Sequence, residues 1–172
     1  EGKALLVVDN PFEAYCKIVQ HYRPFEPSSK MISDTAIIGE GSFVYPNAFV
    51  GNHVSIGKNC IIYPNVTIMD HCIIGNNVII QPGTVVGGNS FYYNGKKDRE
   101  VWYKKMPDCG RVIIEDDVMI GAGSLVPPRK RLESGYLYVG SPVQKVRPLT
   151  DKEKEFLTYS ARHYVKVAGN YQ

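Results

Sequence analysis

An aliphatic residue returns at every sixth position between residues 32 and 86, and the same spacing resumes at Ile114. A small or slender residue follows four positions after each of the ten between residues 32 and 86, and Gly or Pro often stands between. The aliphatic positions are Ile32, Ile38, Val44, Val50, Ile56, Ile62, Ile68, Ile74, Ile80, Val86, Ile114, Ile120 and Val126. An α-helix repeats every 3.6 residues and a single strand every two, so this longer period predicts a β-solenoid.

Three such hexads close one triangular coil, so residues eighteen apart lie above one another at the strand spacing of about 4.8 Å. Each Ile or Val then points into the prism, where its branched side chain suits a flat, buried surface. The repeat resembles the hexapeptide-repeat family, whose members fold as a left-handed parallel β-helix and assemble as homotrimers. The resemblance predicts an all-β fold of this kind and a homotrimer.

The chain outside the repeat predicts a helix near each end. Residues 4–8 are an apolar run typical of a strand, and Asn10 and Pro11 then offer an N-cap and a first helical residue. After the repeat, Thr150 and Glu153 form a T-x-x-E capping box. We predict three regions: a strand–helix segment at 1–30, a β-helix at 31–146 with an inserted loop at 89–111, and a C-terminal helix at 147–172.

Composition limits the possible partners and the cellular compartment but does not indicate a function. The net charge of +3 over 172 residues is too mild to indicate nucleic acid as a partner. The four cysteines have no C-x-x-C spacing, and Cys60 and Cys72 fall at inward, slender positions. Buried free thiols fit a reducing, cytoplasmic localisation. No apolar run reaches the length of a membrane span, and no signal peptide is recognisable.

Two stretches resemble the UDP-3-O-acylglucosamine N-acyltransferases of lipid A synthesis. They are VVDNPFEAYCKIVQHY at residues 7–22 and VVGGNSFYY at residues 85–93, within a resemblance that covers residues 3–123. The resemblance implies transfer of an acyl chain from an acyl carrier protein thioester, or from coenzyme A, to an amino-sugar nucleotide. A uridine-binding domain precedes the first stretch in that family, so residues 1–30 are expected to be its remnant.

The long interruption of the repeat is rich in aromatic and basic residues. Long loops that leave a solenoid are often functional, and such residues suit an acidic acyl carrier protein. The candidate substrate-binding residues are Asn89, Phe91, Tyr92, Trp102, Lys104 and Lys105. The alternative is a solvated loop that packs against a neighbouring subunit in a trimer.

From residue 112 to residue 170 the chain resembles γ-class carbonic-anhydrase-like proteins instead, and the change falls within residues 114–123. A zinc site of that class needs three histidines, two of them five residues apart. The four histidines here are His21, His53, His71 and His163, and none of them has that spacing. The sequence therefore predicts no metal site and no zinc, despite the resemblance.

The N-acyltransferases use a histidine base in a stretch that follows the IIEDDV segment. Here Ser-Leu-Val-Pro at residues 124–127 takes its place. The remaining candidate catalytic residues are His53 and His71, eighteen apart on one predicted face, with Asp70 beside the second. They could act as a base or as half of a metal site between subunits of a trimer. The alternative is a pair of exposed corner histidines without a catalytic role.

Three functions stay open. The first is an acyltransferase-type protein related to lipid A N-acylation, impaired or inactive as it stands because the base segment is missing. The second is a γ-carbonic-anhydrase-like metalloprotein. The third is an engineered or recombinant chimera, a non-catalytic trimeric β-helix in which the cap of one family closes the coils of another.

Overall fold

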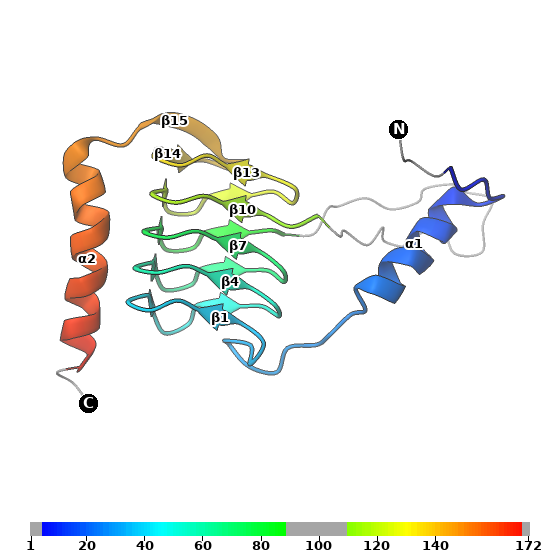
Figure 1. Ribbon diagram of the computed structural model, residues 1–172, viewed down its shortest axis with the longest axis horizontal. Helices are drawn as coiled ribbons and strands as arrows, with labels where there is room; N and C mark the ends of the chain where they lie inside the picture. The colour runs from blue at the N-terminus through cyan, green and yellow to red at the C-terminus, as the bar shows by residue number, and fades with distance from the viewer. Residues whose placement is uncertain (1–4, 89–109, 170–172) are drawn as a thin grey trace. The chain divides into compact units, whose positions relative to one another are not determined.

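The computed structural model describes residues 5–88 and 110–169 (Figure 1). The chain divides into two compact units, Glu1–Pro27 with Asn89–Cys109 and Ser28–Gly88 with Gly110–Gln172. Helix α1 (Pro11–Tyr22) belongs to the first unit. The described strands β1–β15 and helix α2 (Asp151–Gly169) belong to the second unit.

Helix α1 begins where the capping residues predict. Asn10 Oδ1 accepts a hydrogen bond from the backbone N–H of Glu13 at 3.3 Å, and Pro11 lies in the first turn. The apolar run before the helix differs from the prediction, because the described residues 5–8 adopt no strand. A strand needs a neighbour to accept its backbone hydrogen bonds, and none of the described sheets includes this run.

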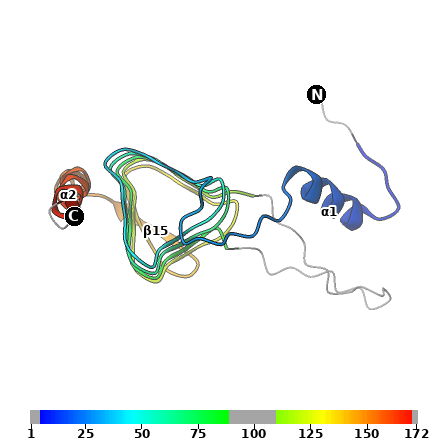
Figure 2. The ribbon, with the colours of Figure 1, turned by 90° about the horizontal axis from the view of Figure 1, so that it is seen from below.

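The second unit is a parallel β-helix of very short strands, which confirms the predicted fold. Its strands form three sheets, in the orders β1-β4-β7-β10-β13, β15-β14-β11-β8-β5-β2 and β12-β9-β6-β3. Figure 2 shows the three-sided cross-section that these sheets enclose. The strands are β1 (Ile37–Ile38), β2 (Phe43–Val44), β3 (Phe49–Val50), β4 (Ser55–Ile56), β5 (Ile61–Ile62), β6 (Thr67–Ile68), β7 (Ile73–Ile74), β8 (Ile79–Ile80), β9 (Val85–Val86), β10 (Ile113–Ile114), β11 (Met119–Ile120), β12 (Leu125–Val126), β13 (Arg131–Leu132), β14 (Tyr136–Val139) and β15 (Gln144–Pro148).

The register between coils is the eighteen-residue step that the repeat predicts. Ile38 pairs with Ile56, and Ile56 pairs with Ile74. The step then lengthens to forty residues, since Ile74 pairs with Ile114. The difference, 40 − 18 = 22, is the length of chain inserted between β9 and β10. The coils above and below the insertion keep the same inward positions.

The inward aliphatic residues form the main core of the prism. Those of the middle and upper coils, from Val50 to Val126, are almost fully buried. Ile32 and Ile38 begin two of the columns and remain 38% and 37% exposed. No described coil lies beyond them, so this end of the hydrophobic stack is open to solvent.

Most of the described corners place one residue in the left-handed backbone region, three positions after the inward residue. Glycine, asparagine, aspartate and histidine tolerate positive φ better than most residues. The non-glycine residues with positive φ are Asn47, His53, Asn59, Asn65, His71, Asn77, Asp117 and Arg129. The asparagines and glycines scattered through the repeat are therefore the backbone signature of its turns.

The C-terminal end of the prism is closed by a hairpin, and a helix follows it along one side. β14 continues one sheet in parallel, and β15 returns antiparallel to it after a turn at Gly140. The predicted capping box then begins α2, because Thr150 Oγ1 accepts from the Glu153 N–H and the Glu153 carboxylate accepts from the Thr150 N–H.

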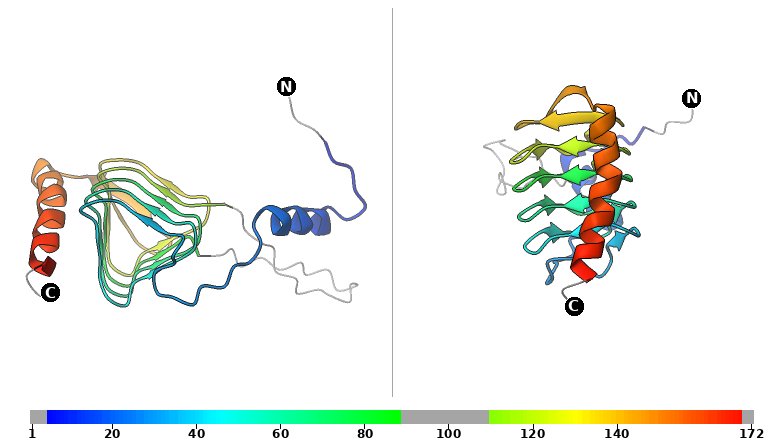
Figure 3. Two further views of the ribbon diagram at one scale, coloured as in Figure 1. Left: turned by 60° about the horizontal axis from the view of Figure 1, so that its bottom comes forward. Right: turned by 90° about the vertical axis from the view of Figure 1, so that its left-hand side faces the viewer.

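Helix α2 lies on the sheet that contains β2 and crosses its successive coils (Figure 3). Leu157 is fully buried there in a second apolar cluster with Ile61, Ile79 and Leu149. Within the described part of the chain, neither helix has the length and hydropathy needed to span a bilayer.

Candidate functional site

The two candidate histidines lie one above the other on the corner that joins the β3 sheet to the β1 sheet. Their ring centroids are 4.9 Å apart and their planes differ by 17°, so the imidazoles stack. His53 is exposed and His71 is half-buried. Both have positive φ, 55° and 61°, which places them at equivalent turn positions of successive coils. The structure therefore brings this pair together as predicted, and we name it the imidazole pair.

Asp70 lies beside His71 in sequence, but one of its carboxylate oxygens is used by the coil. Asp70 Oδ1 accepts a hydrogen bond from the backbone N–H of Asn52 at 2.8 Å. The same kind of bond occurs twice at another corner. Asn76 Oδ1 accepts from the Lys58 N–H at 2.8 Å, and Asp116 Oδ1 accepts from the Asn76 N–H at 2.7 Å. This recurring bond satisfies a turn N–H. Asp70 therefore stabilises a turn, whether or not it also takes part in catalysis.

Residues 124–127, where the N-acyltransferase resemblance implies a histidine base, are built into the prism. Ser124 is 1% exposed; its Oγ donates to the Gly121 carbonyl at 2.7 Å and accepts from the Gly140 N–H at 3.2 Å. Val126 is fully buried. Residues 124–127 thus supply no titratable side chain, and the one hydroxyl among them is engaged in the turn.

The loop candidates lie outside the described residues. Asn89, Phe91, Tyr92, Trp102, Lys104 and Lys105 all fall within residues 89–109. Their assignment to substrate binding stays a prediction.

The described cysteines, Cys16, Cys60 and Cys72, are buried free thiols, and the inward positions of Cys60 and Cys72 in the repeat predict their burial. Burial raises the pKa of the Cys60 and Cys72 thiols to about 11. The Cys60 Sγ also donates to the Gly75 carbonyl at 3.1 Å. Since the thiolate is the reactive form, neither group suits a nucleophile.

The described residues of a single chain offer few groups that could bind a metal ion together. Among residues 5–88 and 110–169, no three His, Cys, Asp or Glu side chains gather closely enough to hold an ion. The imidazole pair supplies two rings that stack face to face. Structural and catalytic zinc sites need at least three protein ligands that converge on one point.

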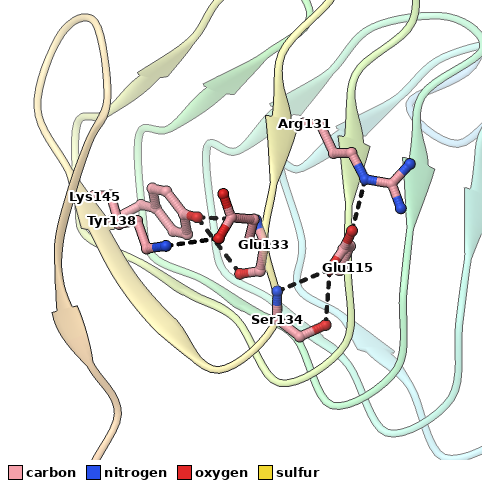
Figure 4. Close-up of polar contacts among 6 residues, drawn as sticks. All are labelled: Glu115, Arg131, Glu133, Ser134, Tyr138 and Lys145. Carbon is pink, nitrogen blue, oxygen red and sulfur yellow. Dashed lines mark hydrogen bonds and ion pairs between the residues drawn. The ribbon is translucent and has the colours of Figure 1, made fainter.

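A polar cluster at the upper end of the prism was missed by sequence reasoning (Figure 4). Glu115 accepts from Arg131 Nε at 2.6 Å and from the Ser134 N–H at 3.0 Å, and these bonds lower its pKa. Glu133 accepts from Lys145 Nζ at 2.6 Å, which raises the lysine pKa. These contacts tie β13 and β15 to the last coil.

Tyr138 stands at the centre of this end. It is 3% exposed and continues the inward column above Ile120, with its hydroxyl accepting from the Glu133 N–H at 2.9 Å. Burial raises its pKa. The burial of Tyr138 could have been predicted from the sequence. Tyr138 is eighteen residues after Ile120 and therefore stands at the next inward position of the same column.

Comparison with known proteins agrees with the repeat. The family described as "Bacterial transferase hexapeptide (six repeats)" matches residues 35–68 and 53–88, and "Hexapeptide repeat of succinyl-transferase" matches residues 111–127. A crystal structure of a hexapeptide transferase family protein from Anaplasma phagocytophilum has a TM-score of 0.52 and 23% identity, covering 82% of this chain and 81% of that one. That likeness shows the fold.

Two curated relatives match shorter segments. Protein YrdA of Escherichia coli (strain K12) is 64% identical over 47 residues, 27% of this chain and 26% of that protein. Gamma carbonic anhydrase 2, mitochondrial, of Arabidopsis thaliana is 39% identical over 57 residues, 33% of this chain and 20% of that protein. The matched segments therefore span about a quarter or less of these relatives.

The class of protein follows from the coils, whose parallel strands form three sheets around one aliphatic core with an inward residue at every sixth position. The chain belongs to the hexapeptide-repeat β-helix family.

Proposed function

We propose that the chain is an acyltransferase-type protein related to lipid A N-acylation, and that its transfer activity is impaired as it stands. In the reaction, the amine of an amino-sugar nucleotide attacks the carbonyl carbon of an acyl carrier protein thioester. The C–N bond forms and the C–S bond breaks, and a base on the protein takes the proton released by the amine and passes it to the leaving thiolate. We place the site in a homotrimer in the cytoplasm.

The observation behind the impairment is the state of residues 124–127. A histidine base in the coil after IIEDDV is what the N-acyltransferase resemblance would require, and this coil holds the buried, hydrogen-bonded Ser124 instead. General-base catalysis contributes about 10²–10⁴-fold to a rate. A chain without that base is therefore expected to transfer acyl groups slowly.

The imidazole pair is the remaining candidate base on the described coils. His71 is half-buried and stacked on His53, and its backbone N–H donates to the Asn52 carbonyl at 2.8 Å, so the main chain at this position is held by the coil below. Its ring lies at an outward corner, where a substrate beside the prism can reach it.

The test is a transfer assay with an acyl-loaded acyl carrier protein and a UDP-glucosamine acceptor, read by mass spectrometry of the N-acyl product. The variants are His53→Asn and His71→Asn, because asparagine occupies four equivalent turns, at residues 47, 59, 65 and 77, with positive φ. His163→Asn, in α2, is the matched control for loss of an imidazole. We expect slow product formation that falls about 100-fold in His71→Asn and is unchanged in the control.

The outcomes distinguish the assignment of the imidazole pair as the base from the assignment of acyl transfer as the activity. Product from the wild type that is unaffected by His53→Asn and His71→Asn removes the imidazole pair and keeps acyl transfer. No product above the protein-free blank, at enzyme concentrations comparable with the substrate, overturns the proposal.

A γ-carbonic-anhydrase-like metalloprotein is the second candidate, and the match to a mitochondrial gamma carbonic anhydrase favours it. Elemental analysis and a CO₂ hydration assay test it: one metal ion per chain together with hydration would establish it in place of acyl transfer. Inactivity in both assays, in a chain that still melts as a stable trimer, would identify the non-catalytic chimera.

A further inference from the structure

A chain of polar groups runs through the corner that carries the imidazole pair. Ser33 Oγ donates to Asn52 Oδ1 at 2.6 Å, and both side chains are only 7% exposed. The hydroxyl oxygens of Ser33 and Thr35 lie 3.0 Å apart, and Thr35 Oγ1 accepts from the backbone N–H of His53 at 2.9 Å. Because a serine hydroxyl has one proton and Asn52 receives it, the Thr35 hydroxyl donates to Ser33. The bonds therefore run in one direction, from the His53 N–H to Asn52.

The second histidine is held by the same chain of groups, through the backbone of Asn52. The Asn52 carbonyl accepts from the His71 N–H at 2.8 Å, and the Asn52 N–H donates to Asp70 Oδ1 at 2.8 Å. Both histidines have positive φ, a conformation that a residue with a Cβ keeps only where its surroundings hold it. Each imidazole therefore stands on a backbone N–H that is bound within one set of residues, which we call the corner network: Ser33, Thr35 and Asn52.

The turn at this corner does not require polar side chains. In the two upper described coils, the positions equivalent to Asn52 hold Gly110 and Pro128. The positions equivalent to Ser33 there hold Gly87 and Pro127. Burial of a hydroxyl or an amide is unfavourable unless hydrogen bonds compensate for the lost water. The buried serine and asparagine thus accompany the coils that carry the imidazole pair, where the backbone alone gives no reason for them.

We propose that the corner network holds the imidazole pair in its stacked orientation, so that Ser33 and Thr35 are positioning residues for the base. The two rings stack with centroids 4.9 Å apart and planes 17° from parallel. A base acts only when its nitrogen lies within hydrogen-bond reach of the proton it takes, and a displacement of about 1 Å can lower a rate roughly 100-fold. The catalytic consequence rests on the proposed acyl transfer, whereas the orientation of the rings does not.

The first experiment is NMR of the histidine side chains in the full chain, because stacked imidazoles shift the signals of each other's ring protons. The variants His53→Asn and His71→Asn assign these signals, and each gives the shift of the remaining ring without its neighbour. The test variant is Ser33→Ala with Thr35→Val, which removes both hydroxyls and changes side-chain size little. Thr35→Ser keeps a hydroxyl that can accept from the His53 N–H.

The matched control is Ser42→Ala. Ser42 Oγ accepts from the Cys60 N–H at 2.9 Å and donates to the Gly57 carbonyl at 2.7 Å, so it makes the same kind of bond between coils. Its corner carries no histidine in the described coils. Ser42→Ala therefore loosens one turn without touching the imidazole pair.

We expect the ring-proton shifts of the test variant to move toward the values of the unstacked rings. Thr35→Ser and Ser42→Ala should keep the shifts of the wild type. Unchanged shifts in the test variant would overturn the proposal, and so would equal changes in the control, since they would mean a general loosening of the coils. A melting temperature as high as that of the control would show that the test variant is folded. Thr35→Val alone, at an exposed position, gives the same test if the double variant does not fold.

The second experiment is the transfer assay with the same variants. We expect kcat to fall about tenfold or more in the test variant with KM unchanged, and to be retained in Thr35→Ser, because a displaced base affects the chemical step rather than binding. Loss of stacking in a protein whose wild type shows no turnover would keep the role of the corner network and refute acyl transfer. Unchanged stacking in a protein that does turn over would refute the corner network and keep acyl transfer.

Discussion

Truncation of the same side chain at two levels of one column should have different costs. Ile38 and Ile74 belong to a single inward column, two coils apart, and differ chiefly in burial, 37% against 2% exposed. Substitution by alanine removes three carbon atoms at either site. At about 0.8 kcal/mol for each buried methylene, full burial of these atoms is worth about 2.4 kcal/mol.

Ile74→Ala should cost more than this transfer value, because the coils above and below hold the cavity open. We expect a loss of about 3–4 kcal/mol in the free energy of unfolding, within the range for large-to-alanine changes in cores. Ile38→Ala leaves no enclosed cavity at the open end and loses only the buried part of its transfer energy, about 1.5 kcal/mol.

The assay is urea denaturation followed by circular dichroism at one fixed protein concentration, since assembly would make stability depend on concentration. The difference between the two variants should be roughly 2 kcal/mol. Equal losses would refute the reasoning: either the two side chains do not share a column or the Ile38 end is covered in solution.

Three further outcomes follow from local contacts. Leu157→Ala should lower the free energy of unfolding by about 2–5 kcal/mol, because Leu157 is fully buried. Limited trypsin digestion should then cut α2 first. A variant that resists trypsin as well as the wild type does would contradict the packing of α2. The hydrogen bonds from Arg147 lower the Glu153 pKa from 4.5 to about 2, so the stability they add is complete above pH 4.5 and is lost as pH falls through 2. Glu153→Gln should therefore melt below the wild type at pH 7 and together with it near pH 2, and parallel curves would argue against the ion pair. Cys60 and Cys72, with pKa values near 11, should react with a thiol reagent at pH 8 only after unfolding, and rapid labelling of the native chain, located by mass spectrometry, would contradict their burial.

The repeat could be followed from sequence because each hexad obeys the same local rule. An inward aliphatic residue, a turn residue that accepts positive φ and a slender residue at the next inward position recur in each coil, and the pairing of Val50 with Ile68 follows from that period. The stacking of His53 on His71 is a consequence of the same arithmetic. The Thr150 and Glu153 capping box was readable for a similar reason, since all its partners lie within three residues.

The features that sequence reasoning missed depend on contacts between distant segments. The bond from the Asn52 N–H to Asp70 joins two coils, and it gives Asp70 a role in the turn that its position beside a histidine does not suggest. The apolar run at residues 5–8 shows strand character but is part of no sheet in the described chain. Local propensity indicates what a segment can form, and a partner decides whether it forms.

By itself, then, the sequence determined the prism: a period of six repeated along the chain permits few structures other than coils whose inward residues stack. Tertiary structure alone decided which end of the stack stays open, which sheet α2 covers, and that Ile114 joins the column of Ile74 across the insertion. The reason is that hexads specify the contacts within and between neighbouring coils, whereas an insertion, a cap and a docked helix are placed by non-local packing that no periodic pattern encodes.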